Sequence, residues 1–100
     1  MLSRLDLQVL TAHDPNHALR LVDANSVVDL VVTDIRLPDI NGVELMRRIR
    51  QRLPKMKVIY VSGDPDAEEM ISDADRGCRF LQKPFGLREL EETVRPLLTG

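Results

Sequence analysis

The sequence predicts an α/β domain built on a parallel sheet, and two patterns carry this prediction. Short apolar runs typical of buried strands alternate with stretches of helical periodicity, in the order β-α-β-α-β-α-β-α. Strands that alternate with helices favour parallel pairing, which brings all the strand carboxyl ends to one edge of the sheet. A length of 100 residues suits one hydrophobic core and is too short for two. We therefore expect one domain over residues 1–100, with four strands and four helices.

The first strand and the first helix are both expected to be short. Leu7–Ala12 reads as a strand, and at most one helical turn precedes it. Asp14 before Pro15 is typical of an N-cap followed by proline in the first turn. Apolar residues at helical spacing then predict a helix from about Pro15 to Ala24.

The second strand is the most strongly patterned stretch of the chain. Leu30–Asp34 is a run of branched apolar residues ending on a carboxylate, as expected of a strand that is buried on both faces. A loop rich in turn residues follows, and helical periodicity then runs from Val43 to Leu53, where Pro54 ends it. The arginines of this helix are expected on a solvated face, with Glu44 placed to pair with Arg48.

The second half of the chain predicts two more strand and helix pairs. Lys57–Gly63 reads as another buried strand, and Asp64 with the proline after it opens a short acidic helix that Gly77 stops. Few apolar residues lie in this helix, so we expect it to be the least firmly packed. Cys78–Leu81 gives a last short strand, and the final helix from Leu87 is expected to be interrupted near its end by Pro96.

The composition argues against several classes of function. A net charge of -2 with 3% aromatic residues gives no electrostatic basis for direct nucleic-acid binding. The single cysteine, Cys78, cannot form an internal disulfide and is expected to be a small buried hydrophobe. No apolar stretch is long enough for a signal peptide or a membrane span, so we expect a cytoplasmic location. His13 and His17 are too isolated from other ligands to suggest zinc.

Three strand ends on the expected edge carry three different polar groups. Asp34 offers a carboxylate, Ser62 a hydroxyl and Lys83 an ammonium group. A carboxylate can accept a phosphoryl group as an acyl phosphate, a hydroxyl can bond a phosphoryl oxygen, and a lysine can neutralise the developing charge. The set therefore predicts a phosphoaspartate pocket, which a hard cation such as Mg²⁺ would normally complete.

Around these residues the chain resembles the receiver domain of two-component response regulators and hybrid histidine kinases. The stretch from Asp34 to Gly42 is similar to the family's phosphoacceptor motif, Val61-Ser62-Gly63 to its hydroxyl motif, and Lys83-Pro84-Phe85 to its lysine and proline. The spacing between the three motifs is also ordinary for the family. The resemblance implies a flavodoxin-like α/β fold of three layers, with helices on both faces of the parallel sheet, and a cis bond before Pro84.

The resemblance also implies a role for each site residue. Asp34 would be the phosphoacceptor, Ser62 and Lys83 would contact the phosphoryl group, and Phe80 stands at the aromatic switch position. Mg²⁺ would be held by Asp34 and by the backbone carbonyl of Arg36, together with an acidic pair. The implied partner is a histidine kinase or a phosphotransfer protein, and the implied output is a change in the face built from the last strand and last two helices.

The resemblance covers about residues 7–98 and lacks the family's usual opening. A receiver domain begins with a strand that ends in two acidic residues, followed by a full helix, and its strand order is 2-1-3-4-5. The missing strand is the one that would lie beside the Asp34 strand. Its absence removes the acidic pair that holds the metal and is expected to leave a hydrophobic strand edge unpaired.

Three explanations of this gap are open. The chain is an ordinary receiver truncated at its start, or a natural variant without the first βα unit, or a rearranged domain. In the rearranged case Leu7–Ala12 slides beside the Asp34 strand, or a second chain supplies the pairing by exchange. Ala12 and His13 would then occupy the positions of the acidic pair, with Asp14 serving as a helix cap. We also expect the isolated chain to associate, as a homodimer or a strand-exchanged oligomer.

Two functions follow from these observations. The first is a phosphorelay receiver that is phosphorylated on Asp34 and is impaired by the missing acidic pair, with weak or no Mg²⁺-dependent phosphorylation. The second is a phosphorylation-independent module for dimerisation or docking. An enzyme is not expected, because phosphotransferases and phosphatases with an aspartyl nucleophile usually carry a second aspartate two residues on, where this chain has Arg36.

Overall fold

A computed structural model describes residues 8–24, 28–71 and 77–99 of the chain. The elements, in chain order, are β1 (Val9–Ala12), α1 (Pro15–Asp23), β2 (Leu30–Asp34), α2 (Gly42–Arg52), β3 (Lys57–Ser62), the 3-10 helix η2 (Pro65–Met70), β4 (Cys78–Gln82) and α3 (Leu87–Thr99). The expected α/β class is therefore confirmed, and each expected strand is present. The residues before Gln8 and the expected end of the acidic helix lie outside the described ranges.

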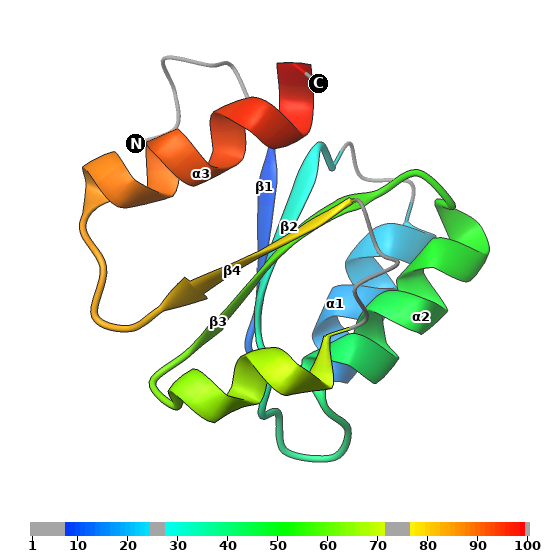
Figure 1. The fold of residues 1–100 in the computed structure, drawn as a ribbon. Coiled ribbons are helices and arrows are strands. Elements are labelled where there is room, and N and C mark those ends of the chain that lie inside the picture. The colour runs from blue at the N-terminus through cyan, green and yellow to red at the C-terminus, as the bar shows by residue number, and fades with distance from the viewer. Residues whose placement is uncertain (1–7, 25–27, 72–76, 100) are drawn as a thin grey trace.

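The helices cover both faces of one parallel sheet, so the domain has three layers (Figure 1). α1 and α2 pack side by side on one face, and α3 lies on the other face, mainly against β3 and β4. The core is correspondingly divided into two clusters, one on each side of the sheet. None of the helices in the described ranges combines the length and the apolar character that crossing a membrane requires.

The strand order is β1-β2-β3-β4, with all neighbours parallel. The expectation of an unpaired edge on β2 is wrong, because Val9 of β1 lies opposite Leu30 of β2 and Ala12 lies opposite Thr33. This is the rearranged arrangement, in which the first strand takes the place beside Asp34. The physical reason is that β2 is apolar and buried, and its backbone donors and acceptors would be costly to leave without partners.

The local signals at the helix starts agree with the sequence. Asp14 caps α1, where its carboxylate accepts a hydrogen bond of 2.9 Å from the amide of Asn16, and Pro15 occupies the first turn. Asn41 caps α2 in the same way, accepting from the amide of Glu44 at 2.8 Å. These two caps fix where the chain turns from each strand into the helix that follows.

Two helices depart from the expected pattern. The acidic segment forms the 3-10 helix Pro65–Met70, and only Ala67 of this segment is buried. With so little apolar surface to bury, it gains little packing energy for a regular α-helix. α3 continues through Pro96 to Thr99 instead of being interrupted there. Pro96 costs the helix one backbone hydrogen bond, and Leu97, which is buried in the core cluster under α3, packs the last turn against the sheet.

Candidate functional site

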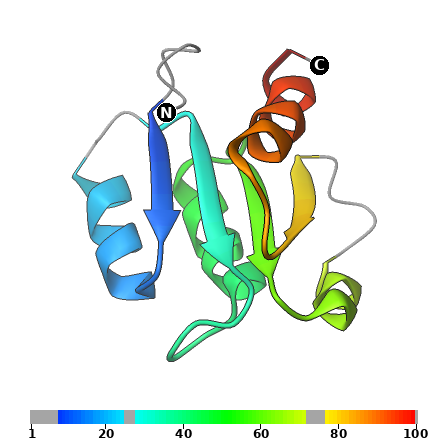
Figure 2. The same cartoon turned by 90° about the vertical axis from the view of Figure 1, so that its left-hand side faces the viewer.

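The carboxyl ends of the strands meet at one edge of the sheet, where the arrowheads point the same way in Figure 2. Asp34, the last residue of β2, lies opposite Val61 of β3, so Ser62 stands one residue further along. Lys83 follows the end of β4, and its amide donates a hydrogen bond of 2.8 Å to the carbonyl of Ser62. The three strand-end residues singled out in the sequence therefore lie on neighbouring strands at one edge.

The Asp34 carboxylate has a basic side chain beside each of its oxygens. Lys83 Nζ lies 2.6 Å from Oδ1, and His13 Nδ1 lies 3.6 Å from Oδ2. The Asp34 side chain is 24% exposed, whereas that of His13 is 74% exposed. The carboxylate is thus accessible to a small donor molecule. Lys83 lies closer to it than His13 does.

His13 reaches this position because β1 pairs directly with β2. The register places Ala12 opposite Thr33. The residues that follow them, His13 and Asp34, are therefore level with each other. Sequence reasoning treated His13 as isolated, since no ligand lies near it along the chain. One signal was available: if the first strand lies beside the Asp34 strand, Ala12 and His13 fall where the resemblance places the acidic pair. His13 then comes close to Asp34.

The backbone of Asp34 is held by close packing against the start of α2. A Cβ atom on Gly42 would lie 2.4 Å from the Asp34 carbonyl oxygen and 3.2 Å from Thr33 Cγ2. The Gly42 amide donates a hydrogen bond of 2.6 Å to the carbonyl of Ile35, and the Thr33 hydroxyl donates one of 3.0 Å to the carbonyl of Asp34. Glycine at this position lets the helix approach the strand end closely enough to fix it.

The other predicted site residues, Ser62 and Phe80, lie on β3 and β4. The Ser62 hydroxyl accepts a hydrogen bond of 3.0 Å from the amide of Asp64, and the Asp64 carboxylate pairs with Arg36 at 3.2 Å. Phe80 lies on β4 opposite Tyr60 and is partly buried against the core cluster on the α1 and α2 face. The Lys83-Pro84 peptide bond is cis, as the resemblance implied.

The carboxylates of the described residues do not assemble a magnesium site. Mg²⁺ in proteins is held by one or two carboxylates together with other oxygen ligands. Within residues 8–24, 28–71 and 77–99, no three acidic, histidine or cysteine side chains lie close enough together to hold a metal. Asp14 and Asp64 are both engaged as helix caps, each bonded to a backbone amide of its own helix. At this edge Asp34 is flanked by Lys83 and His13 and not by the acidic pair that the resemblance implied, so the described residues do not fit that metal site.

A separate ionic cluster stabilises the exposed face of α2. The carboxylate of Glu44 is bonded to Arg47 at 2.6 Å and to Arg48 at 3.1 Å, and the Arg48 contact agrees with the sequence. The hydrogen bond from Arg47 and then that from Arg48 lower the pKa of Glu44 from 4.5 to about 2. The same contact raises the pKa of Arg47. This cluster is formed within one helix, so we assign it a structural role.

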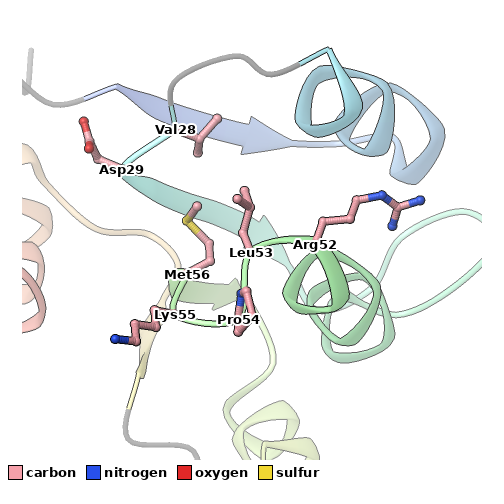
Figure 3. Close-up of a pocket in the computed structure, with 7 residues that line it drawn as sticks. All are labelled: Val28, Asp29, Arg52, Leu53, Pro54, Lys55 and Met56. Carbon is pink, nitrogen blue, oxygen red and sulfur yellow. The ribbon is translucent and has the colours of Figure 1, made fainter.

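A hollow of about 470 Å³ lies at the opposite edge of the sheet, where β2 and β3 begin (Figure 3). It is lined by Val28, Asp29, Arg52, Leu53, Pro54, Lys55 and Met56. Asp29 accepts a hydrogen bond from the amide of Gln8, and Arg52 pairs with Asp23. The amino ends of parallel strands are not where ligands usually bind in such sheets, so the chemistry is assigned to the Asp34 edge.

Comparison with known proteins identifies the fold and the family. The family model for the response regulator receiver domain matches residues 1–95. The chain is 42% identical over 74 residues to the sensor kinase CckA of Brucella abortus, covering 71% of this chain and 8% of that protein. It is 35% identical over 100 residues to the DNA-binding transcriptional regulator NtrC of Azospirillum brasilense, covering 99% of this chain and 21% of that protein.

A solved structure extends the likeness to three dimensions. The receiver domain of NtrX from Brucella abortus superposes with a TM-score of 0.76 at 30% identity, covering 99% of this chain and 85% of that one. Of the two curated relatives, CckA and NtrC, the chain spans less than a quarter of the length. The likeness to those two proteins therefore concerns one part of each of them.

Proposed function

The chain belongs to the response regulator receiver domain family, a non-enzymatic signalling module of two-component systems, and we propose that it accepts a phosphoryl group on Asp34. Receiver domains interact with histidine kinases, and the matching region of CckA lies within a sensor kinase. The proposed donor is accordingly the phosphohistidine of a histidine kinase or of a phosphotransfer protein.

The observation that carries this proposal is the contact of Lys83 Nζ with Asp34 Oδ1 at 2.6 Å. In the proposed step, the other carboxylate oxygen of Asp34 attacks phosphorus. A P–O bond forms and the P–N bond of the phosphohistidine breaks, and the departing imidazole nitrogen keeps the electron pair. Lys83 stabilises the charge that develops on the transferring group, which is the main contribution a protein makes to phosphoryl transfer.

The proposed output is a change in the surface around β4 and α3. Phosphorylation would draw the Ser62 hydroxyl away from the amide of Asp64, to which it is now bonded at 3.0 Å, and towards a phosphoryl oxygen. Phe80, which lies only partly buried on the neighbouring strand, would move inward to fill the space. A partner that binds one of these two arrangements better than the other would read the signal.

Receiver domains typically bind Mg²⁺, but this chain lacks a matching carboxylate set in its described residues. We therefore propose that Mg²⁺ stimulates its phosphorylation weakly or not at all. The test is to incubate the chain with acetyl phosphate, with and without Mg²⁺, and to measure the intact mass. A phosphate adduct that is absent from Asp34→Asn is expected. No adduct, or an unchanged adduct in Asp34→Asn, would contradict the proposed acceptor.

A second candidate function is self-association through the sheet face that α3 leaves open. α3 packs mainly against β3 and β4, so Val9 and Val32 are only partly covered and Thr11 is exposed on that face. A second copy could cover this patch as a phosphorylation-independent homodimer. Light scattering at high protein concentration tests it: a dimer that Thr11→Lys weakens supports it, with His17→Lys as the matched surface control. A monomer mass throughout would contradict it.

A further inference from the structure

The two sides of Asp34 are occupied by basic side chains where the family's metal site would need carboxylates. Lys83 approaches Oδ1 and His13 approaches Oδ2. The ammonium group of Lys83 has only donors, and an imidazole carries at least one N–H in each of its common forms. A third basic residue, Arg36, lies nearby and is already paired with Asp64. The polar groups that face Asp34 from its neighbouring strands are thus arranged for an anion.

His13 has the freedom to serve such an anion. Its side chain is 74% exposed, and its distance of 3.6 Å from Asp34 Oδ2 is longer than a hydrogen bond. A phosphoryl group added to Oδ2 would extend outward from the carboxylate into the space beside this ring. An imidazole carries at least one N–H donor in every common protonation state, so donation to a phosphoryl oxygen needs no change of charge.

We propose that the site operates without a divalent metal, with His13 donating to the phosphoryl oxygens from the β1 side while Lys83 does so from the β4 side. This inference rests on the proposed phosphorylation of Asp34, and it assigns Oδ2 as the attacking oxygen because Lys83 holds Oδ1. His13 is then a phosphoryl-binding residue. Its role follows from the direct pairing of β1 with β2, which brings it level with Asp34.

Phosphorylation kinetics test the proposal directly. The chain is incubated with acetyl phosphate in EDTA and, separately, in Mg²⁺, and the adduct is followed by intact mass. We expect similar rates in the two solutions and a fall of about tenfold or more in His13→Ala. This is less than the roughly 10²–10³-fold that loss of a close donor commonly costs, because His13 is exposed and lies 3.6 Å from Asp34 Oδ2. His13→Asn, which keeps an N–H donor, is expected to recover part of the rate. His17→Ala, a histidine on the exposed surface of α1, is the matched control.

Anion binding gives a second measurement that does not depend on phosphorylation. Asp34→Asn removes the repelling charge and is titrated with inorganic phosphate in EDTA while the His13 ring protons are followed by NMR. Saturable shifts of His13, lost when Lys83→Met is added, support the proposal. If Asp34 proves not to be phosphorylated but phosphate still shifts His13, the proposed function fails and the anion site remains.

Three results would overturn the inference. Phosphorylation of His13→Ala at the rate of the unaltered chain would remove the role of His13. A rate of the unaltered chain that rises more than about tenfold on adding Mg²⁺ would contradict operation without a metal. Phosphate titration of Asp34→Asn with no change at His13 would contradict the anion site. Circular dichroism of each variant confirms that the fold is retained.

Discussion

The two sides of β2 bring side chains to Asp34 in different ways. On one side the motif spacing along the chain indicates which residues meet, and on the other side the strand order decides it. On the β3 and β4 side, Ser62 and Lys83 reach the strand end through a regular register, and Lys83 contacts Asp34 at 2.6 Å. On the β1 side, His13 reaches Asp34 only because β1 lies next to β2. The first flank brings an ammonium group to Asp34 and the second an imidazole.

The largest expected effect compares the two edge strands through a matched pair of leucines. Leu10 on β1 is 7% exposed and Leu81 on β4 is 8% exposed, each within one of the two core clusters. Replacing either with alanine is expected to lower the free energy of unfolding by about 2–5 kcal/mol, because both leave a cavity in packed surroundings. Urea denaturation measures both. A near-neutral Leu10→Ala beside a costly Leu81→Ala would mean that β1 is not packed on the sheet.

The second prediction breaks the β4 flank of the site. Lys83→Met keeps the length of the side chain but removes its charge, so phosphorylation by acetyl phosphate is expected to slow by about 10²–10³-fold, the usual cost of removing a donor to a developing charge. The rate of adduct formation by intact mass is the measurement. Lys55→Met, at the opposite edge of the sheet, is the control and should leave the rate unchanged. Equal rates in both variants would exclude Lys83 from the site.

The third prediction concerns the position that both flanks share. Gly42→Ala would bring a Cβ atom within 2.4 Å of the Asp34 carbonyl oxygen, so the start of α2 or the end of β2 must move. We expect destabilisation of about 1–3 kcal/mol, as for other overpacked positions, and slower phosphorylation. Gly63→Ala is the control, because apart from the neighbouring residues of the chain no atom lies within 4 Å of the added methyl group. Equal unfolding midpoints for the two variants would show that the close approach does not exist.

The smallest effect lies outside the site, on α2. The pKa of Glu44 is lowered from 4.5 to about 2 by hydrogen bonds from Arg47 and Arg48. A carboxylate with a lowered pKa in the folded state contributes stability above its unfolded pKa, and this contribution is lost as the pH falls through the window from 4.5 towards 2. Glu44→Gln is therefore expected to be slightly less stable than the unaltered chain at pH 7.

The measurement is the difference in unfolding midpoint between the two proteins as the pH is lowered. That difference should shrink below about pH 4 and vanish near pH 2, with no effect on phosphorylation at pH 7. A difference that stays constant across this range would show that ionised Glu44 does not contribute through the arginine contacts.

Much of the fold and one flank of the site could be predicted from the sequence. The apolar run ending in Asp34, the cap at Asp14 and the turn into α2 are local signals, and the structure has each of them. The strand-end groups Asp34, Ser62 and Lys83 followed from the alternation of strands and helices, because parallel strands bring their carboxyl ends together.

For the other flank the sequence leaves three arrangements open, one of them with Leu7–Ala12 beside the Asp34 strand, because local periodicity does not determine strand order. Leu7–Ala12 has the same pattern whether it lies beside Leu30–Asp34 or one place further away. The choice depends on satisfying the backbone of β2, a property of the whole sheet. The approach of His13 to Asp34 follows from that choice and was therefore outside the reach of spacing. The 3-10 form of Pro65–Met70 was missed for a related reason, because its acidic sequence does not specify how much of it packs.

The pairing of β1 with β2 is the claim on which the His13 flank depends, and proton contacts across the two strands test it most directly. A nuclear Overhauser spectrum of the isotope-labelled chain is expected to connect the backbone protons of Leu10 with those of Val31, and those of Ala12 with those of Thr33. Absence of these contacts, with the β2 amides that face β1 exchanging freely with solvent, would contradict the arrangement that places His13 beside Asp34.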